Sequence, residues 1–480
     1  MKNIEFYARG VAWSLMVSPM DKIQVAMTRA SEFGAQSSDS RAATSFDPAT
    51  FVKSLRRSKS MRTRILSADP AHLGIVHGLQ GKGRRGLSAS SASSGSMTIL
   101  TPTLIVEGAR SNDMKAARNA GARIVHEGFD GKVLLAVEQI DQLSGVIALL
   151  QKRDVGAVSP NFLRRFGRTP LSTTSRDWAH IKIGLKKAWA ITKGSRDVSV
   201  AVLDEGVDTT HPDLRSSVVG QHDFIGDKGD SAMPDGNDAH GTACAGIIVA
   251  RGSNAGGIAP KCSLLAARIA MDDGAGNWVF DDFATADAID WAWRQGAAAI
   301  SNSWGGGVPS DSIGRAFGRA RTQGRGGKGS LVCIAAGNNQ RPIDFPGSLP
   351  GYVTVGASNS NDERKTRTST DGEPWGSGFG PTMWLLAPGV SINTTDISGA
   401  AGYEPGDYTA TFNGTSSATP HVAGAAALMI SANPNLSASD VRILLSKTAR
   451  LIPGQTEWTA EEGHGRLDVA AAVAAAKAHA

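Results

Sequence analysis

Short apolar runs alternate with longer segments of helical spacing through the last two thirds of the chain. Five runs have the length and apolar content of strands buried on both faces: VSVAVLD, SLLAARIA, AAAISNSW, SLVCIAAGN and YVTVGAS. Four segments have apolar residues three and four positions apart: DDFATADAIDWAWRQG, SIGRAFGRARTQG, SSATPHVAGAAALMISA and SASDVRILLSKTA. Because parallel strands need crossover connections, this alternation predicts an α/β fold with a mostly parallel sheet between layers of helices.

A smaller pattern precedes this one. TLIVEG, KVLLAVE and VGAVSPNFLRRF are predicted strands, and MKAARNAGARIV and IDQLSGVIALLQKR are predicted amphipathic helices, which together form a small α+β domain. Residues 31–98 are rich in Ser, Arg and Ala without apolar periodicity, and we expect a disordered segment or linker there. The predicted division is therefore an N-terminal extension (1–98), a small domain (99–172) and the α/β domain (173–480).

Charge is distributed unevenly between the two ends of the chain. Residues 1–175 contain 24 Lys and Arg against 13 Asp and Glu, whereas residues 176–480 contain 26 against 31. The basic residues are scattered and are not interleaved with aromatic residues, which argues against nucleic-acid binding. Two oppositely charged parts that attract each other fit the distribution better.

Apolar segments and cysteines say little about the compartment. No run of about 18 apolar residues predicts a membrane span. Residues 11–20 (VAWSLMVSPM) are weakly similar to a signal peptide, but the run is short, is broken by serines and a proline, and lacks an A-x-A site. Cytoplasmic and extracellular locations both stay open. Cys244, Cys262 and Cys333 lie in apolar surroundings, and we expect buried, inert thiols.

Three residues at element ends are candidates for nucleophilic catalysis. Asp204 ends a predicted buried strand, His240 begins an apolar helix in DAHGTACAGII, and Ser416 stands at a helix start in FNGTSSATPHVAGAAALM. There Gly414 permits a tight turn, and we expect Pro420 in the first helical turn. Singly, each has an ordinary structural explanation, such as a helix cap. Together they are the set that a serine nucleophile needs, because histidine accepts its proton and a carboxylate fixes the histidine tautomer.

The segments VAVLDEGVDTTHPDL, HGTACAGI, AAGN and NGTSSATPHVAGAAAL resemble, in order, the Asp, His, oxyanion-hole and Ser blocks of the subtilisin-like serine proteases (subtilases, peptidase S8). The resemblance covers about residues 176–477. It implies a serine endopeptidase that needs no cofactor for catalysis, with Asp204 orienting His240, His240 acting as base and then acid, and Ser416 attacking the carbonyl. Asn338 and the Ser416 backbone N–H would form the oxyanion hole.

The same resemblance implies where a polypeptide substrate binds. The segment 301–306 (SNSWGG) resembles the family's substrate-binding strand, with an extended peptide pairing along it. The residues concerned are Ser303, Trp304 as a subsite wall, Gly305, Ala336 and Gly337 beside the pocket for the residue before the cut, and Asp344 near its floor. The alternative for Trp304 is a position in the core, where tryptophan is often buried. A carboxylate at 344 would favour Lys or Arg in the substrate, and the alternative is a turn-capping aspartate.

Calcium often stabilises this family. Asp213 in HPDL matches a family calcium ligand, but the partner loop RGSNAGGIAP is short for a tight site. Asp235, Asn237 and Asp238 offer oxygen ligands that suit a hard cation, or form a solvated loop. We expect the loop and assign no metal ligand, while a structural calcium ion stays open.

Residues 99–172 resemble the inhibitor-I9-like propeptides of the family, chiefly in VGAVSPNFLRRF. This implies a monomeric, self-processing proenzyme whose own propeptide is an intramolecular inhibitor, cut within 164–175. Arg165 or Arg168 would precede the cut if Asp344 selects basic residues. The alternatives are a catalytically inactive scaffold and a peptide ligase or macrocyclase that excludes water from the acyl-enzyme. The intact set of four catalytic positions favours the endopeptidase.

Overall fold

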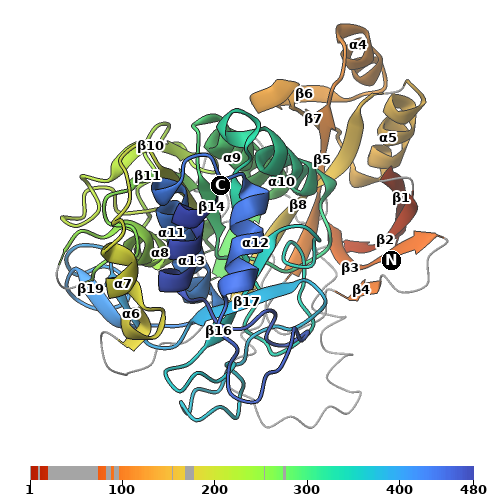
Figure 1. Cartoon of the computed structure of the whole chain (residues 1–480). Coiled ribbons are helices and arrows are strands. Elements are labelled where there is room, and N and C mark those ends of the chain that lie inside the picture. Colours follow the sequence, from red (N-terminus) through yellow and green to blue (C-terminus); the bar gives the residue numbers. More distant parts are fainter. Residues whose placement is uncertain are drawn as a thin grey trace.

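A seven-stranded sheet and a ten-stranded sheet organise the molecule (Figure 1). The computed structural model describes the backbone of residues 2–8, 11–19, 74–82, 88–90, 97–153, 155–167, 178–252, 255–273 and 277–479, and the side chains from residue 98 to 164 and from 178 onward within those ranges. Within these ranges, no helix has both the length and the apolar character needed to cross a bilayer.

The larger unit is built on a seven-stranded sheet in which every neighbouring pair is parallel. Its strands in spatial order are β10 (Val218–Asp223), β11 (Ser263–Arg268), β9 (Ser199–Asp204), β14 (Ala299–Asn302), β15 (Leu331–Ala335), β16 (Val353–Ser358) and β17 (Met383–Pro388). The five predicted strands are all present. The predicted subtilisin-like α/β fold with a mostly parallel sheet is therefore confirmed.

Helices cover both faces of this sheet, which makes three layers. One layer consists of α9 (Asp282–Arg294) and α10 (Asp311–Gln323). The other consists of α6 (Trp178–Lys182), α7 (Leu185–Trp189), α8 (His240–Val249), α11 (Thr415–Ala432), α12 (Ala438–Thr448) and α13 (Val469–Ala478). Side chains of β9 alternate between the two cores: Val200 and Val202 face α8 and α11, whereas Ala201 and Leu203 face α9. A two-stranded ribbon, β18 (Ile392–Thr395) and β19 (Tyr408–Phe412), packs beside α8.

The N-terminal unit forms a second, largely antiparallel sheet. Its described elements are β1 (Lys2–Ala8), β2 (Val11–Pro19), β3 (Gly74–Lys82), β4 (Ser88–Ser90), β5 (Met97–Glu107), α4 (Ser111–Asn119), β6 (Arg123–Glu127), β7 (Val133–Ala136), α5 (Leu143–Lys152) and β8 (Ala157–Gly167). The described parts of residues 1–98 are thus strands in one sheet with β5. Most of the expected linker, residues 31–98, lies outside the described residues. Backbone hydrogen bonding to a neighbouring edge needs little side-chain periodicity, so the pattern gave no signal.

One predicted helix of this unit is too long. MKAARNAGARIV was expected to be helical throughout, but α4 ends at Asn119 and Arg123–Glu127 is strand β6, paired with β7. Gly121 has φ of +88°, and the Ala122 N–H bonds back to Ala117 O, so the chain turns out of the helix there.

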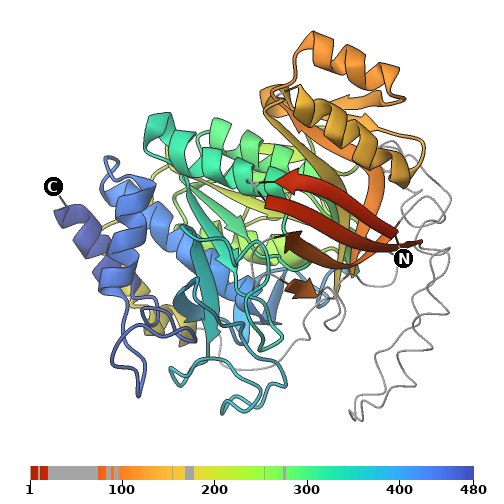
Figure 2. The same ribbon diagram turned by 90° about the vertical axis from the view of Figure 1, so that its right-hand side faces the viewer.

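Strand β8 joins the two units. It pairs antiparallel with β5 on one side and with β13 (Asn277–Asp281) on the other. Strand β13 leads directly into α9 of the larger unit and also pairs with the short β12 (Met271–Asp272). Figure 2 views the molecule from the side of the N-terminal unit, with its red and orange strands in front of the green part of the larger unit. The last described residues of the N-terminal unit therefore run along β13 of the larger unit.

Candidate active site

The parallel sheet brings Asp204 and His240 together. Asp204 ends β9, and His240 is the first residue of α8. The ring Nδ1 lies 2.9 Å from Asp204 Oδ1 and 3.0 Å from Oδ2, and both side chains are buried. A carboxylate can only accept a hydrogen bond, so Nδ1 carries a proton and donates a hydrogen bond to Asp204. This pairing compensates the burial of the carboxylate and leaves Nε2 of a neutral ring unprotonated.

Neighbouring groups fix the histidine in place. The carboxylate of Glu205, fully buried, accepts a hydrogen bond from the His240 backbone N–H at 2.8 Å. The rings of Trp278 and Phe412 lie edge-on to the imidazole, with centroids 4.4 and 5.2 Å away. The sequence analysis missed these three residues. Glu205 alone carried a signal, an acidic residue directly after a buried strand.

Gly241 allows the helix to approach the strand. A Cβ at this position would lie 2.1 Å from Gly206 O and 2.8 Å from Asp204 Cβ, and both distances are too short for a real side chain. The glycine after His240 is thus required by the distance between α8 and the end of β9.

Ser416 lies at the second position of α11, after Gly414 with φ of +115°. Its hydroxyl donates to the carbonyl of Ser303 at 3.2 Å, and within the described chain no hydrogen bond joins it to His240. Pro420 was expected in the first turn but is the sixth residue of the helix. Proline has no N–H, so the Ser416 carbonyl lacks its helical donor and accepts from Ser303 Oγ at 2.9 Å instead. Ser303 therefore contacts the serine through both its carbonyl and its hydroxyl.

Asn338 and the start of α11 create a space with two converging donors. Asn338 Oδ1 accepts from the N–H and the hydroxyl of Thr415, at 2.8 and 2.9 Å, which fixes the orientation of the amide. A Cβ built on Gly414 would lie 3.1 Å from Asn338 Nδ2 and 3.3 Å from the Ser416 nitrogen. The two donors thus border the space that the glycine leaves open. A negatively charged oxygen there would also meet the positive end of α11.

The other predicted substrate-binding residues have different environments. Trp304 was expected to form a subsite wall, but its indole is buried, donates to Leu203 O and stacks on Phe317. A large aromatic ring gains more from the core under α10 than from an open cleft.

The pocket candidates lie beside Asn338 or face the segment 344–346. Gly305 approaches Phe345 O, and the Gly337 N–H donates to Thr415 Oγ1, whereas Ala336 is buried and pairs with Val355 O. Asp344 is an exposed residue, and partial desolvation of its carboxyl raises the pKa while Arg341 opposes this.

The predicted calcium candidates are engaged with protein groups. Asp213 Oδ2 accepts from the Tyr408 hydroxyl at 2.8 Å, and no cluster of carboxylates surrounds it within the described residues. Asp235 forms ion pairs with Lys228 and Arg268, and Asn237 Oδ1 accepts from Gly402 N–H.

The three cysteines are free and buried, as predicted. Cys244 lies beside Asp204 and His240, in the one described group of three potential metal ligands. Burial, followed by the negative charge of Asp204, raises the pKa of its thiol well above the usual value. A buried, protonated thiol is a poor nucleophile.

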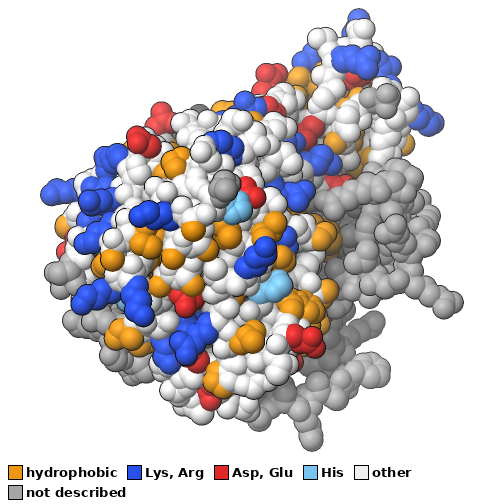
Figure 3. Space-filling model, in the orientation of Figure 1, with side chains coloured by type: hydrophobic (Ala, Val, Ile, Leu, Met, Phe, Trp, Pro, Cys, Tyr) orange, Lys and Arg blue, Asp and Glu red, His pale blue; other side chains and the backbone are white. Residues whose placement is uncertain are grey.

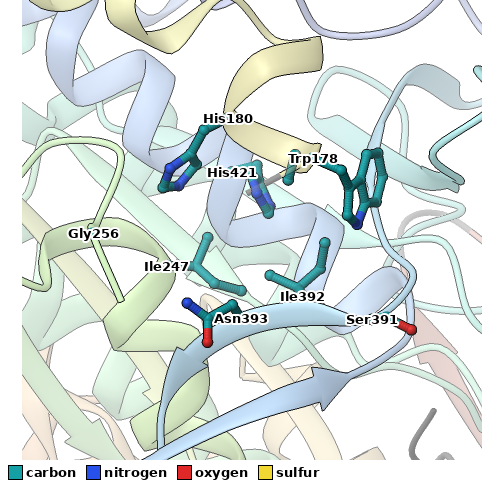
Figure 4. Close-up of a pocket in the computed structure, with 9 residues that line it drawn as sticks. Trp178, His180, Ile247, Gly256, Ser391, Ile392, Asn393 and His421 are labelled. Atoms are coloured by element: carbon teal, nitrogen blue, oxygen red, sulfur yellow. The ribbon is translucent and has the colours of Figure 1, made fainter. Parts of the chain in front are cut away.

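A small pocket lies on another side of α11, between α6, α8 and β18 (Figure 4). His421 points into it from α11, with His180 and Asn393 nearby. His421 Nδ1 donates to Ser417 O at 2.8 Å. Burial lowers the pKa of His421 to about 3, opposed by this hydrogen bond and assisted by His180. The pocket is separate from the Asp204–His240 pair.

The buried His421 predicts loss of stability in acid. Its folded pKa of about 3 lies below the ordinary value near 6.5, so the unfolded chain binds the proton first and stability falls as pH falls from about 6.5 to about 3. The loss is on the order of 5 kcal/mol. Thermal unfolding of a Ser416→Ala chain, which avoids autolysis, should therefore show a Tm that falls less steeply over this range once His421→Asn is added. An exposed-site control, His479→Asn, should leave the slope as it was, and equal slopes for all three would contradict the assignment.

Comparison with known proteins gives one family. A model of the subtilase family matches residues 195–465, more than half of the chain. Thermitase of Thermoactinomyces vulgaris is 36% identical over 305 residues, which cover 62% of this chain and 96% of thermitase. A calcium-dependent protease of Nostoc sp. is 32% identical over 379 residues, covering 68% of this chain and 54% of that protein. Fervidolysin of Fervidobacterium pennivorans, a keratinolytic enzyme related to subtilisin, superposes with a TM-score of 0.62 at 25% identity, over 78% of this chain and 61% of fervidolysin.

The three-layer fold and these protease relatives define a serine-type endopeptidase. The chain belongs to the subtilase family.

Proposed function

We propose that this endopeptidase cuts polypeptides with Asp204, His240 and Ser416 as its catalytic triad, and that it is made as a proenzyme that processes itself. The observation that carries the proposal is the buried Asp204–His240 hydrogen-bonded pair on the element ends next to the start of α11, which carries Ser416. In these roles Asp204 holds the ring with Nε2 unprotonated, and His240 Nε2 is the base.

The first step would transfer the Ser416 proton to His240 Nε2 while Oγ attacks the peptide carbonyl. This requires rotation of the hydroxyl away from Ser303 O, which is consistent with the longer catalytic hydrogen bonds of unliganded enzymes. The developing oxyanion would be stabilised by Asn338 Nδ2 and the Ser416 N–H, the two donors beside Gly414. His240 would then protonate the leaving amine, and water would release the acyl group from Ser416. All groups in this scheme belong to the protein, so catalysis needs no cofactor.

The N-terminal unit would act as an intramolecular inhibitor through β8. An extended peptide that adds to an exposed edge strand is a common form of peptide recognition, and β8 adds to β13 in this way. The backbone of residue 166 lies opposite Trp278, whose ring contacts His240. This register favours a cut directly after Gly167, the end of β8, over one after Arg165. Arg168 lies outside the described residues. A cut after Gly167 would leave Asp344 as a turn residue without a role in processing.

Buried ion pairs support a specific contact between the units. Lys132, fully buried, donates to Asp290 at 2.7 Å and to Asp287 at 3.4 Å on α9. Arg319 bridges Asp290 at 2.7 Å and Glu107 at 3.0 Å. Burial by itself raises the pKa of Asp290. The hydrogen bonds and charges of Arg319 and Lys132 lower it by more, so the net shift of the pKa is downward. These pairs agree with the charge asymmetry of the sequence, although Figure 3 shows other basic side chains at the outer tip of the N-terminal unit, far from this contact.

Removal of the Lys132 charge should loosen this contact. Lys132→Met removes the only cation from Asp287, which keeps the Phe129 N–H, and leaves Asp290 with Arg319 and the Trp293 indole N–H. We expect a cost of about 3–5 kcal/mol. In a Ser416→Ala background, limited proteolysis by an added protease should then cleave the N-terminal unit faster, and Tm should fall. Lys115→Met, which removes an exposed lysine of α4, is the matched control. Equal protection in the two variants would contradict a role for this ion pair.

Labelling tests the proposed function directly. The purified full chain is incubated, followed by intact mass and N-terminal sequencing, and then treated with a fluorophosphonate whose site is mapped by peptide mass spectrometry. We expect the label on Ser416 and a new N-terminus at residue 168. A label on another serine would overturn the triad, and a chain that labels at Ser416 without being shortened would overturn self-processing only.

A further inference from the structure

The contact between β8 and the larger unit contains a buried arginine. Arg164 is 1% exposed, and its guanidinium donates to both carboxylate oxygens of Asp282, at 2.6 and 3.1 Å. Asp282 is fully buried, and both of these bonds come from Arg164. A two-pronged bond of this kind fits the planar guanidinium of arginine and not the amine of lysine.

Three further contacts of this arginine come from the larger unit. Arg164 Nη1 donates to Gly306 O at 2.9 Å, and the guanidinium lies over the Phe345 ring, 5.1 Å from its centroid. A Cβ on Gly307 would lie only 2.9 Å from Arg164 Nη1, so the absence of a side chain there makes room. A carboxylate, a carbonyl, an aromatic face and a glycine from three separate segments thus converge on one cationic side chain.

The site has a fixed position relative to the proposed cut. Residues 163–167 form an antiparallel ladder with β13, in which Arg164 lies opposite Phe280 and Gly167 opposite Asn277. Arg164 is therefore the fourth residue before a bond cut after Gly167. Any extended substrate that replaced β8 in the same register would present its own fourth residue to Asp282.

We propose that Asp282 is a specificity-determining residue, and that this enzyme prefers polypeptides with arginine at the fourth position before the cleaved bond. This inference rests on the proposed function, because it takes β8 as occupying the place of a substrate. Selection comes mainly from exclusion: a substrate without a cation would cover Asp282 and leave its charge buried and unpaired. The N-terminal unit meets the same requirement with Arg164.

Peptides that carry the enzyme's own junction provide the test. Internally quenched peptides with the sequence of residues 161–171 are compared with versions in which Arg164 or, as a charge control, Arg165 is replaced by Ala. For the processed wild-type enzyme we expect kcat/KM to fall about 10- to 100-fold for the first replacement and less than about 3-fold for the second. Similar values for all three peptides would overturn the proposal without any variant enzyme.

Two variants then assign the effect to its residue. Asp282→Asn should bring the intact and Arg164→Ala peptides to within about 3-fold of each other. Asp311→Asn, which changes the first residue of α10 as Asp282 is the first of α9, should retain the full preference. A preference that persists in Asp282→Asn would overturn the assignment. Fluorophosphonate labelling separates the two hypotheses, because an enzyme that labels at Ser416 and cuts all peptides equally contradicts only the specificity, whereas one that neither labels nor cuts contradicts the proposed function.

Discussion

Replacement of Ser416 by Ala should lower kcat by about 10⁶-fold and leave the chain at full length after incubation. The reason is that no other described group near His240 can replace the nucleophile: the Cys244 thiol is buried and its pKa is raised, so it stays protonated. Residual activity would reflect only the donors at Asn338 and the Ser416 N–H, worth about 10³–10⁴ over water. The measurement is hydrolysis of a quenched peptide, together with intact mass.

A matched control separates catalysis from folding in this experiment. Ser431→Ala also removes a hydroxyl from α11, far along the helix from Ser416, and it should retain activity within a few fold. The free energy of unfolding of Ser416→Ala should lie within about 1 kcal/mol of the wild-type value, since the Ser416 hydroxyl makes a single hydrogen bond, to Ser303 O. Activity in Ser416→Ala above about 1% of wild type would exclude Ser416 as the nucleophile.

Asp204→Asn should reduce kcat by about 10⁴-fold with little change in KM. An amide at this position can donate as well as accept, so the His240 Nδ1 proton is no longer required and the ring can adopt the tautomer with the proton on Nε2, which cannot act as base. The stabilisation of the imidazolium in the transition state is lost at the same time. The measurement is the pH–rate profile of the variant against that of the wild type.

Two comparisons make the Asp204 result specific. Glu205→Gln changes the neighbouring buried acid, whose carboxylate accepts from the His240 backbone rather than from the ring. Its ring tautomer should be unaffected, so we expect a loss below about 100-fold and an unchanged acidic limb of the pH–rate profile. If Asp204→Asn and Glu205→Gln lost activity equally and both kept the wild-type pH profile, the role of Asp204 would be structural.

The sequence by itself determined the α/β class and the candidate triad. Uninterrupted apolar runs such as VSVAVLD are nearly sufficient for buried parallel strands, because few other structures bury both faces of so short a segment. The local patterns around His240 and Ser416 are similarly constrained: Gly241 has no room for a side chain, and Gly414 has φ of +115° beside two hydrogen-bond donors. Where the backbone has no room for a side chain or needs a positive φ, the sequence has a glycine, and that glycine can be recognised in the local pattern.

Only the tertiary structure decided which residues surround these positions. Trp304 lies in the core, and Glu205, Trp278 and Phe412 contact His240 although they come from three different segments. The strands β10 and β17, which were not predicted, lie at the two edges of the sheet. Strand β10 (VVGQHD) is buried only at Asp223 and lacks a continuous apolar run, whereas β17 (MWLLAP) is buried at every residue except Trp384, which is half-buried.

The Arg164–Asp282 pair is the clearest case, since 118 residues separate its partners. An arginine in LRRF and an aspartate in FDDF are ordinary surface residues by composition, and only the ladder between β8 and β13 makes them a buried pair. Local sequence determines the backbone conformation and the spacing of buried residues, because both depend on residues that are close along the chain. Long-range pairing depends on register between segments, which no local pattern encodes.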